Sequence, residues 1–230
     1  MTIADRMSSI QSLIRAYEKK YRREENSVHL LGVGKGQPIE KLVEAWHAGL
    51  RLFGENYLQE ALKKIEHFKS KGFQAEWHFI GTLQRNKTRK IAEHFDWIHT
   101  VDDVVIARRL HDQRPDHLPS LNICIEVNIN REEAKSGVNL DKAAALVEYC
   151  MTLPRLRVRG LMCIPEHVDD FLTQQINYHR LYSLFQELHL TYPSLNTLSM
   201  GMSQDFEAAI SEGATIVRIG TALFGERLMK

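Results

Sequence analysis

Cysteine is scarce in this chain, and the few that occur do not form a recognisable bridging or metal-binding pattern. The 230 residues contain only Cys124, Cys150 and Cys163. An odd number of widely spaced cysteines is neither a disulfide framework nor a zinc-ligand set, and it favours a reducing compartment. No histidine pair has zinc spacing, so we predict no metal site. Cys163 ends an apolar run, and we interpret it as an inert core thiol rather than a reactive one.

An excess of charge of one sign is also lacking. Thirty lysines and arginines balance 29 aspartates and glutamates, which leaves a formal net charge of +1 at pH 7. This balance does not indicate a basic surface that binds nucleic acid or a membrane. A local basic cluster does occur, at Arg85, Lys87, Arg89 and Lys90. Because no aromatic platform interleaves it, we interpret the cluster as a solvated helix face and expect no nucleic-acid partner, with RNA binding kept as a third, disfavoured hypothesis.

Long apolar runs are missing as well. No stretch is apolar over the length that a bilayer requires, and residues 1–21 lack the apolar core of a signal peptide. Low-complexity tracts, solenoid repeats and linker-like segments are also absent from the sequence. We therefore expect a cytoplasmic protein without membrane contact, folded as a single domain over residues 1–230.

The pattern that is present begins with a helix. An apolar stripe recurs at steps of four and three, and its members are Ile3, Met7, Ile10, Ile14, Tyr17 and Tyr21. This spacing predicts an additional N-terminal helix within residues 1–26 that packs on the rest of the chain.

Short apolar segments, many of them β-branched or aromatic, then alternate with helical patterns to the end of the chain. The predicted strands are His29–Gly34, Leu52–Glu55, Trp77–Gly81, Trp97–Val101, Leu121–Ile129, Val158–Ile164, Thr197–Met200 and Ile216–Gly220. Continuous apolar runs indicate strands buried on both faces, as in a parallel sheet. Eight strand–helix units favour an α/β fold of the TIM-like (β/α)8 barrel class, with an open doubly wound sheet as the alternative.

Functional side chains of such a barrel lie where its strands end. Lys35 follows a buried strand and stands between two glycines. Partial desolvation at the barrel mouth lowers the pKa of an amine and makes it a better nucleophile toward a carbonyl group. The plain alternative is a solvated loop lysine, and position alone leaves the two interpretations evenly balanced.

Two loops near the end of the chain favour an anion site opposite this lysine. The segment 199–203 offers small residues and two hydroxyls, and a helix predicted over Gln204–Ser211 makes Ser203 a candidate N-cap. Gly220-Thr221 ends the eighth strand and opens the last helix in the same way. Each loop alone is typical of an ordinary capped turn, but two adjacent loops after strands seven and eight are typical of a phosphate site.

Arg218 lies inside the last strand, between two apolar residues. A buried arginine needs partners, and a barrel carboxylate such as Glu126 is one candidate. The functional alternative is a hydrogen bond from Arg218 to the ring nitrogen of a ligand. Because arginine keeps its proton, it would leave a pyridine nitrogen unprotonated and so weaken the ring as an electron sink.

Several long motifs occur in order between Leu31 and Arg227. They are Phe53–Glu60 (FGENYLQE), Trp77–Lys87 (WHFIGTLQRNK), Lys135–Gly137 (KSG), Gly160–Met162 (GLM), Leu198–Ser203 (LSMGMS) and Val217–Gly225 (VRIGTALFG). Together they resemble the pyridoxal phosphate homeostasis protein family, whose members are related to the N-terminal barrel of alanine racemase.

The resemblance implies a barrel that binds pyridoxal 5′-phosphate (PLP) as an internal aldimine on Lys35 and takes part in intracellular PLP (vitamin B6) homeostasis. It also implies a set of further cofactor-binding residues. These are Ser203, Gly220 and Thr221 at the phosphate, Ser199 nearby, Arg218 at the pyridine nitrogen and Asn56 near the ring. Apo PLP-dependent enzymes are implied as clients, and no firm catalytic reaction is attached to the family.

One departure stands beside the lysine. The family usually has serine and threonine where this chain has Gly34 and Gly36. Lys35 is kept, so Schiff-base chemistry is retained, while two hydroxyls are lost and the backbone gains freedom.

The alternative function is that of a PLP-dependent amino-acid racemase. The related racemases carry a β-rich second domain that supplies a catalytic tyrosine, and the expected barrel leaves no room for it before Lys230. A racemase would need another base, such as Tyr57 or His78, although His78 is better interpreted as a core histidine. The loop residues Glu132, Glu133 and Lys135 would either cover the ring, with Lys135 near the cofactor phenolate, or be solvated.

Overall fold

Eight of the nine strands in the described part of the chain form the centre of the molecule. The computed structural model describes residues 1–130 and 136–226. The strands are β1 (His29–Val33), β2 (Leu52–Glu55), β3 (Glu76–Phe79), β4 (Trp97–Val101), β5 (Leu121–Asn128), β6 (Val138–Asn139), β7 (Leu156–Met162), β8 (Thr197–Ser199) and β9 (Ile216–Ile219). All of their pairings are parallel.

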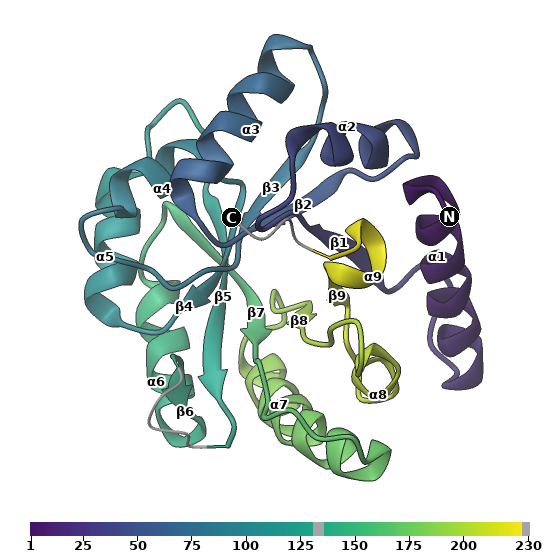
Figure 1. Cartoon of the computed structure of the whole chain (residues 1–230). Coiled ribbons are helices and arrows are strands. Elements are labelled where there is room, and N and C mark those ends of the chain that lie inside the picture. Colours follow the sequence, from purple (N-terminus) through teal and green to yellow (C-terminus); the bar gives the residue numbers. More distant parts are fainter. Residues whose placement is uncertain (131–135, 227–230) are drawn as a thin grey trace.

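The sheet closes on itself. The order of hydrogen-bonded strands is β4-β3-β2-β1-β9-β8-β7-β5, and a further pairing between β4 and β5 completes the ring. The two-residue β6 pairs with β5 alone. Eight parallel strands in a closed ring confirm the predicted TIM-like barrel and exclude the open sheet. Figure 1 shows this ring with the helices arranged around it.

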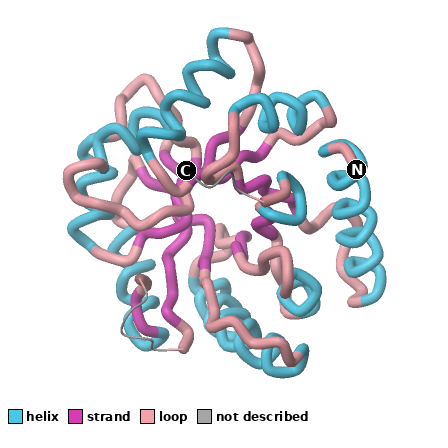
Figure 2. The backbone as a smooth tube through the Cα atoms, viewed as in Figure 1, coloured by secondary structure: helices cyan, strands magenta, loops and turns pink. Residues whose placement is uncertain are grey.

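Helices surround the strands on the outside, as the cyan and magenta tubes of Figure 2 show. They are α1 (Ile3–Lys20), α2 (Ile39–His47), α3 (Leu58–Ser70), α4 (Thr88–His94), α5 (Val104–Gln113), α6 (Leu140–Met151), α7 (Phe171–Thr191), α8 (Phe206–Ser211) and α9 (Thr221–Phe224). The main apolar core lies between these helices and the outer faces of the strands. No helix within the described ranges is both long and apolar enough to cross a membrane.

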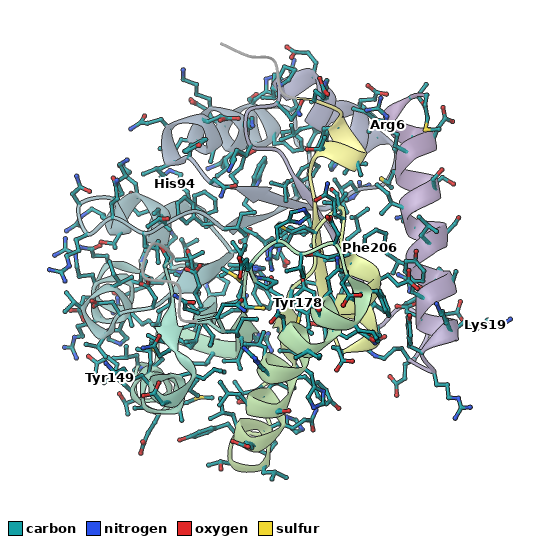
Figure 3. All side chains as sticks on the ribbon, turned by 60° about the horizontal axis from the view of Figure 1, so that its bottom comes forward. Arg6, Lys19, His94, Tyr149, Tyr178 and Phe206 are labelled. Atoms are coloured by element: carbon teal, nitrogen blue, oxygen red, sulfur yellow. The ribbon has the colours of Figure 1, made fainter. Side chains whose placement is uncertain are left out.

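The predicted N-terminal helix is confirmed as α1. A capping box at Thr2 and Asp5 begins the helix, and its apolar stripe is buried. α1 packs against α2, α8 and α9, which lie outside the barrel. Tyr17 of α1 meets the ring of Phe206 edge-on at 5.6 Å, on the side of α8 that faces α1 (Figure 3).

The predicted start of the helix at 204–211, and with it the predicted N-cap, is wrong. α8 begins at Phe206 with Asp205 as its N-cap residue, so Ser203 does not cap it. The reason is a turn before the helix, in which Met202 donates its backbone N–H to Asp205 Oδ1 at 2.6 Å. The shift of two residues places Ser203 inside that turn.

The inside of the barrel is only partly apolar. A small cluster of Leu31, Ile80 and Ile216 fills part of it, separate from the main core. Polar side chains fill other inward positions, and several of them are almost completely buried: His78, Glu126, His99, Ser199 and Arg218. Because buried polar groups are stable only when they are hydrogen-bonded, this interior has to be an ordered network.

Candidate functional site

Lys35 lies at the mouth of the barrel where the strands end, which we call the C-terminal mouth. It follows β1 directly, in a turn, and is partly buried. Its Nζ stands 5.6 Å from the centroid of the Tyr57 ring, a cation–π distance. Tyr57 is 58 % exposed, so the pair lies at the rim of the mouth. The structure thus places the predicted lysine where barrel enzymes and binding proteins hold their functional groups.

The turn that carries Lys35 is fixed from both sides. Gly34 donates its N–H to Gly54 O at 2.9 Å, and its carbonyl accepts from Lys64 Nζ at 2.8 Å. On the other side of the lysine, Gly36 donates its N–H to Glu60 Oε1 at 2.9 Å. Three tethers around one residue leave the backbone of Lys35 little freedom to move.

A buried ion cluster lies beneath this turn. Lys64, only 4 % exposed, pairs with Glu55 at 2.7 Å and also with Glu60. Burial raises the pKa of Glu55 to about 7, and the ammonium of Lys64 opposes the rise. Glu55 Oε2 accepts no hydrogen bond from any described residue. Because this pKa lies near neutral pH, Glu55 is present in both its charged and its protonated form there.

Arg218 is a second buried cation of the site. It is 4 % exposed, and its Nη1 donates to the carbonyl and to the hydroxyl oxygen of Ser199 at 2.6 and 2.8 Å. Its Nη2 donates to Cys163 O at 2.9 Å. Within the described ranges these partners are neutral oxygens, so the expected ion pair with Glu126 is not formed. Three of the five guanidinium N–H groups are thereby used, which leaves two for an acceptor on a ligand.

Ser199 connects Arg218 to a row of polar side chains inside the barrel. Its hydroxyl lies 2.7 Å from His99 Nδ1, and His99 Nε2 lies 2.8 Å from His78 Nδ1. His78 Nε2 in turn lies 2.9 Å from Glu76 Oε1. We call Glu76, His78, His99, Ser199 and Arg218 the interior chain. His78 is fully buried in it, as the core interpretation predicts, and not at the rim where a second base would be needed.

The two predicted anion loops lie beside the end of β1. β9 pairs with β1, and Gly220 follows β9 next to Val33: a β-carbon built at Gly220 would stand 3.5 Å from Val33 Cβ. Thr221 is exposed and opens α9, whose first N–H groups have no acceptor within the helix.

The loop after β8 is hydrogen-bonded to β9. Gly201, at φ +95°, accepts a hydrogen bond from the N–H of Arg218 at 2.9 Å. A β-carbon at Gly201 would meet Ala209 Cβ at 2.6 Å, so the loop follows α8 closely. Ser203, partly buried, lies two residues further on. The loops carrying Ser203 and Thr221 therefore both adjoin β9.

Asn56 approaches from the other neighbour of β1. It follows β2, is partly buried, and donates from Nδ2 to Ile80 O at 3.2 Å. β1 is thus flanked by the strand leading to Asn56 and the strand leading to Gly220. Sequence positions 35, 56, 199, 203, 218, 220 and 221 are all brought to this half of the barrel, with Ser199 facing Arg218 rather than the loop of Ser203.

Two further titratable groups occur near this mouth. Burial raises the pKa of Glu126 to about 7, with Asp102 adding to the rise and Arg218 opposing it. Burial raises the pKa of the Cys163 thiol to about 12, which supports the inert interpretation of that cysteine. Glu132, Glu133 and Lys135 lie outside the described residues. Across the described ranges, no group of three or more His, Cys, Asp or Glu side chains is arranged to hold a metal ion.

The sequence analysis missed several residues of this site. Glu76 and His99 occupy inward positions of β3 and β4, and a polar residue at an inward position of a barrel strand is the signal that would have singled them out. Lys64 was also missed, although Glu60 and Lys64 have the i, i+4 spacing of a helical ion pair.

A family model described as the alanine racemase N-terminal domain matches residues 12–228. Curated relatives match along nearly the whole chain. The pyridoxal phosphate homeostasis protein of Vibrio cholerae is 49% identical over 228 residues, covering 98% of this chain and 97% of that protein. The Escherichia coli K12 protein of the same name is 47% identical over 226 residues, covering 98% of this chain and 97% of that protein. This chain belongs to the pyridoxal phosphate homeostasis protein family.

Solved structures agree with this family membership. PipY of Synechococcus elongatus, solved with PLP bound, has a TM-score of 0.84 at 35% identity, covering 97% of this chain and 100% of that one. The same protein without PLP has a TM-score of 0.86 at the same identity and coverage. An alanine racemase from Clostridium difficile, at 12% identity and a TM-score of 0.68, covers 96% of this chain and 57% of that one, and it shares the fold alone.

Proposed function

We propose that this chain binds PLP at the C-terminal mouth of its barrel and takes part in PLP homeostasis in the cytoplasm. The single observation that carries the proposal is the convergence of Lys35, Arg218 and the Gly220-Thr221 turn on the adjacent strands β1 and β9. Relatives that match nearly the whole chain carry the same functional name, and PipY binds PLP in its structure. Residues 1–230 act as one domain in this proposal.

Lys35 is the residue that bonds to the cofactor. Its amine would hold PLP by condensing with the aldehyde group, with loss of one water, to a Schiff base. The tethers on Gly34 and Gly36 hold the backbone of Lys35 in place, and the centroid of the Tyr57 ring lies 5.6 Å from the amine. A fixed backbone reduces the conformational entropy that Lys35 loses when it reacts.

Arg218 fits the pyridine nitrogen. Its two remaining N–H groups can donate to that nitrogen, and arginine does not give up a proton to it. When bound, PLP supplies an electron sink whose strength depends on protonation of this nitrogen. An arginine partner therefore favours storage of the cofactor over carbanion chemistry. Ser199 supports Arg218 through its hydroxyl, and in this proposal Asn56 borders the ring.

The phosphate is assigned to Ser203, Gly220 and Thr221. Hydroxyls and backbone N–H groups bind phosphate oxygens, and the first N–H groups of α9 have no helical acceptor. Delivery to apo PLP-dependent enzymes follows from this role, because a cofactor held by one Schiff base is released when water adds back to it.

An absorbance titration with PLP, followed by borohydride reduction and peptide mapping, tests the proposal. We expect a Schiff-base band at visible wavelengths and a reduced adduct on Lys35. Lys35→Ala should lose both, while Lys63→Ala on the exposed face of α3 should keep both. An adduct on another residue, or none, would overturn the assignment. Racemase activity is tested separately by measuring the formation of D-alanine from L-alanine. We expect no turnover at ordinary enzyme rates.

A further inference from the structure

The interior chain joins the two ends of the barrel. It begins at the N-terminal mouth, where the strands start, with Glu76 on β3, and it ends at Arg218 on β9. Its central link, from His99 to Ser199, joins residues 100 positions apart and runs from β4 to β8. β5 and β7 separate those two strands in the ring, so this link crosses the barrel interior.

One end of the interior chain is exposed to solvent, and the other end is buried. Glu76 borders a cavity of about 360 Å³ that is lined by the first residues of several strands, and its side chain is 43% exposed. His78, His99 and Ser199 are 0% exposed, and Arg218 is 4% exposed. Solvent therefore reaches the interior chain at Glu76, on the side of the barrel opposite the cofactor site.

The hydrogen bonds of the interior chain can point in only one direction. Arg218 can only donate, so Ser199 Oγ accepts from it and has its own proton to give to His99 Nδ1. At the other end, the hydrogen bond from His78 lowers the pKa of Glu76, which is therefore an ionised acceptor. His78 must then carry its proton on Nε2.

Burial favours the neutral form of both histidines. It lowers the pKa of His78, and it lowers that of His99 well below the usual value, with His78 and Arg218 adding to the effect. A neutral His78 with a proton on Nε2 accepts at Nδ1, so His99 donates from Nε2 and accepts at Nδ1. The constraints from the two ends thus agree on one arrangement of protons.

We propose that Glu76, His78 and His99, acting through Ser199, are positioning residues for Arg218. They fix the two histidines as Nε2–H tautomers and hold Nη1 of the guanidinium, so that its remaining N–H groups face the cofactor. This inference rests on the proposed function, since it assigns Arg218 to the pyridine nitrogen. Successive hydrogen bonds of one direction polarise each other, so loss of any link weakens the hold on Arg218.

The alternative is that the histidines only fill space. His78 stacks on Trp97 at 5.4 Å with an angle of 9°, and an aromatic ring at position 99 would preserve much of the ring packing. A phenylalanine cannot accept from Ser199 or donate to His78, whereas glutamine can do both with its amide oxygen and nitrogen. The two replacements of His99 therefore separate packing from hydrogen bonding.

The first experiment needs no cofactor. Protein labelled with 15N-histidine is examined by NMR without PLP, with assignments from His78→Gln and His99→Gln. We expect both rings to be neutral Nε2–H tautomers at pH 8, and we expect Ser199→Ala to remove the shift signature of a hydrogen-bonded Nδ1 in His99. A protonated ring, or a proton on Nδ1 of either ring, would overturn the proposal.

The second experiment measures PLP affinity. Ser199→Ala and His99→Phe should bind PLP about tenfold more weakly, the loss expected for about one hydrogen bond, while His99→Gln stays within about threefold of the unaltered protein. His29→Gln, at an exposed histidine of the same N-terminal mouth, is the matched control and should bind normally.

Equal affinity for His99→Phe and the unaltered protein would overturn the proposal. If His99→Phe does not fold, the PLP affinity of Ser199→Ala and the histidine tautomers found by NMR decide whether the proposal holds. If the unaltered protein binds no PLP, the proposed function fails, and the NMR result still decides whether the interior chain has the inferred direction.

Discussion

The backbone at Gly34 passes so close to Glu55 that a β-carbon built at Gly34 would stand 2.5 Å from Glu55 Oε1. The carbonyl oxygen of the same glycine accepts a hydrogen bond from Lys64, the ion-pair partner of Glu55. Glycine beside the lysine thus leaves room for a buried carboxylate in this chain.

Gly34→Ala should lower the free energy of unfolding by about 1–3 kcal/mol, because the added methyl group overpacks a site with no free volume. Urea denaturation without PLP measures this. Gly220→Ala is the control, since its β-carbon would have no neighbour nearer than 3.5 Å and its φ is negative. In a double-mutant cycle with Glu55→Ala the two losses should be less than additive, and strict additivity would contradict the steric explanation.

Lys64→Met should destabilise the protein strongly at pH 8, by roughly 3–5 kcal/mol, because it leaves the buried Glu55 carboxylate without its partner. At pH 5 the loss should be smaller, since Glu55, whose pKa is raised to about 7 even beside Lys64, is then neutral when folded. Denaturant unfolding at the two pH values measures both losses. Lys63→Met, one residue away and exposed, should change neither.

Glu126 should make the protein less stable as pH rises. Its pKa of about 7 when folded exceeds the ordinary 4.5, so the folded state binds more protons between these values and stability falls across that window. Glu126→Gln should therefore raise the free energy of unfolding at pH 8 by up to about 3 kcal/mol and change it little at pH 4.5. Glu148→Gln, exposed on α6, is the control, and an equal effect of both changes at pH 8 would refute the assignment.

Arg218→Lys should weaken PLP binding by at least about tenfold while Lys35 still forms the covalent bond. A lysine cannot span Ser199 and Cys163 and donate to a ring nitrogen at the same time, because its three donors radiate from one atom. Absorbance titration gives the affinity, and borohydride reduction shows the adduct. Arg159→Lys, at the N-terminal mouth, should bind PLP normally. Unchanged affinity in Arg218→Lys would remove Arg218 from the cofactor site.

Ser203→Ala and Thr221→Val should reduce the preference for PLP over pyridoxal, which lacks the phosphate. Each change removes one hydroxyl donor, a loss of about tenfold in PLP affinity with little change for pyridoxal. Competition between the two aldehydes in an absorbance titration measures the preference. Ser211→Ala, at the opposite end of α8, keeps it intact in this prediction. Parallel losses for both aldehydes would show that these hydroxyls do not contact the phosphate.

Local patterns in the sequence were enough to locate the eight strands of the barrel, the N-terminal helix and the residues at strand ends, but not the two-residue β6. Apolar periodicity and apolar runs indicate which side of a segment is buried. Both patterns can be recognised from residues that are close together in the sequence. Lys35 and Gly220-Thr221 were found because a barrel gathers its strand ends at one mouth, whatever the details of packing. The position of Ser203 relative to α8 was missed by two residues, since Asp205 competes for the backbone N–H groups before the helix.

Only the tertiary structure decided which side chains meet across the barrel. Ring closure pairs β4 with β5, and this brings His99 within 2.7 Å of a serine 100 residues away. Likewise, Glu55 and Lys64 meet beneath Gly34 because α3 folds back onto the end of β2. Such contacts depend on strand register and on the tilt of a closed sheet, and neither leaves a periodic trace in the sequence.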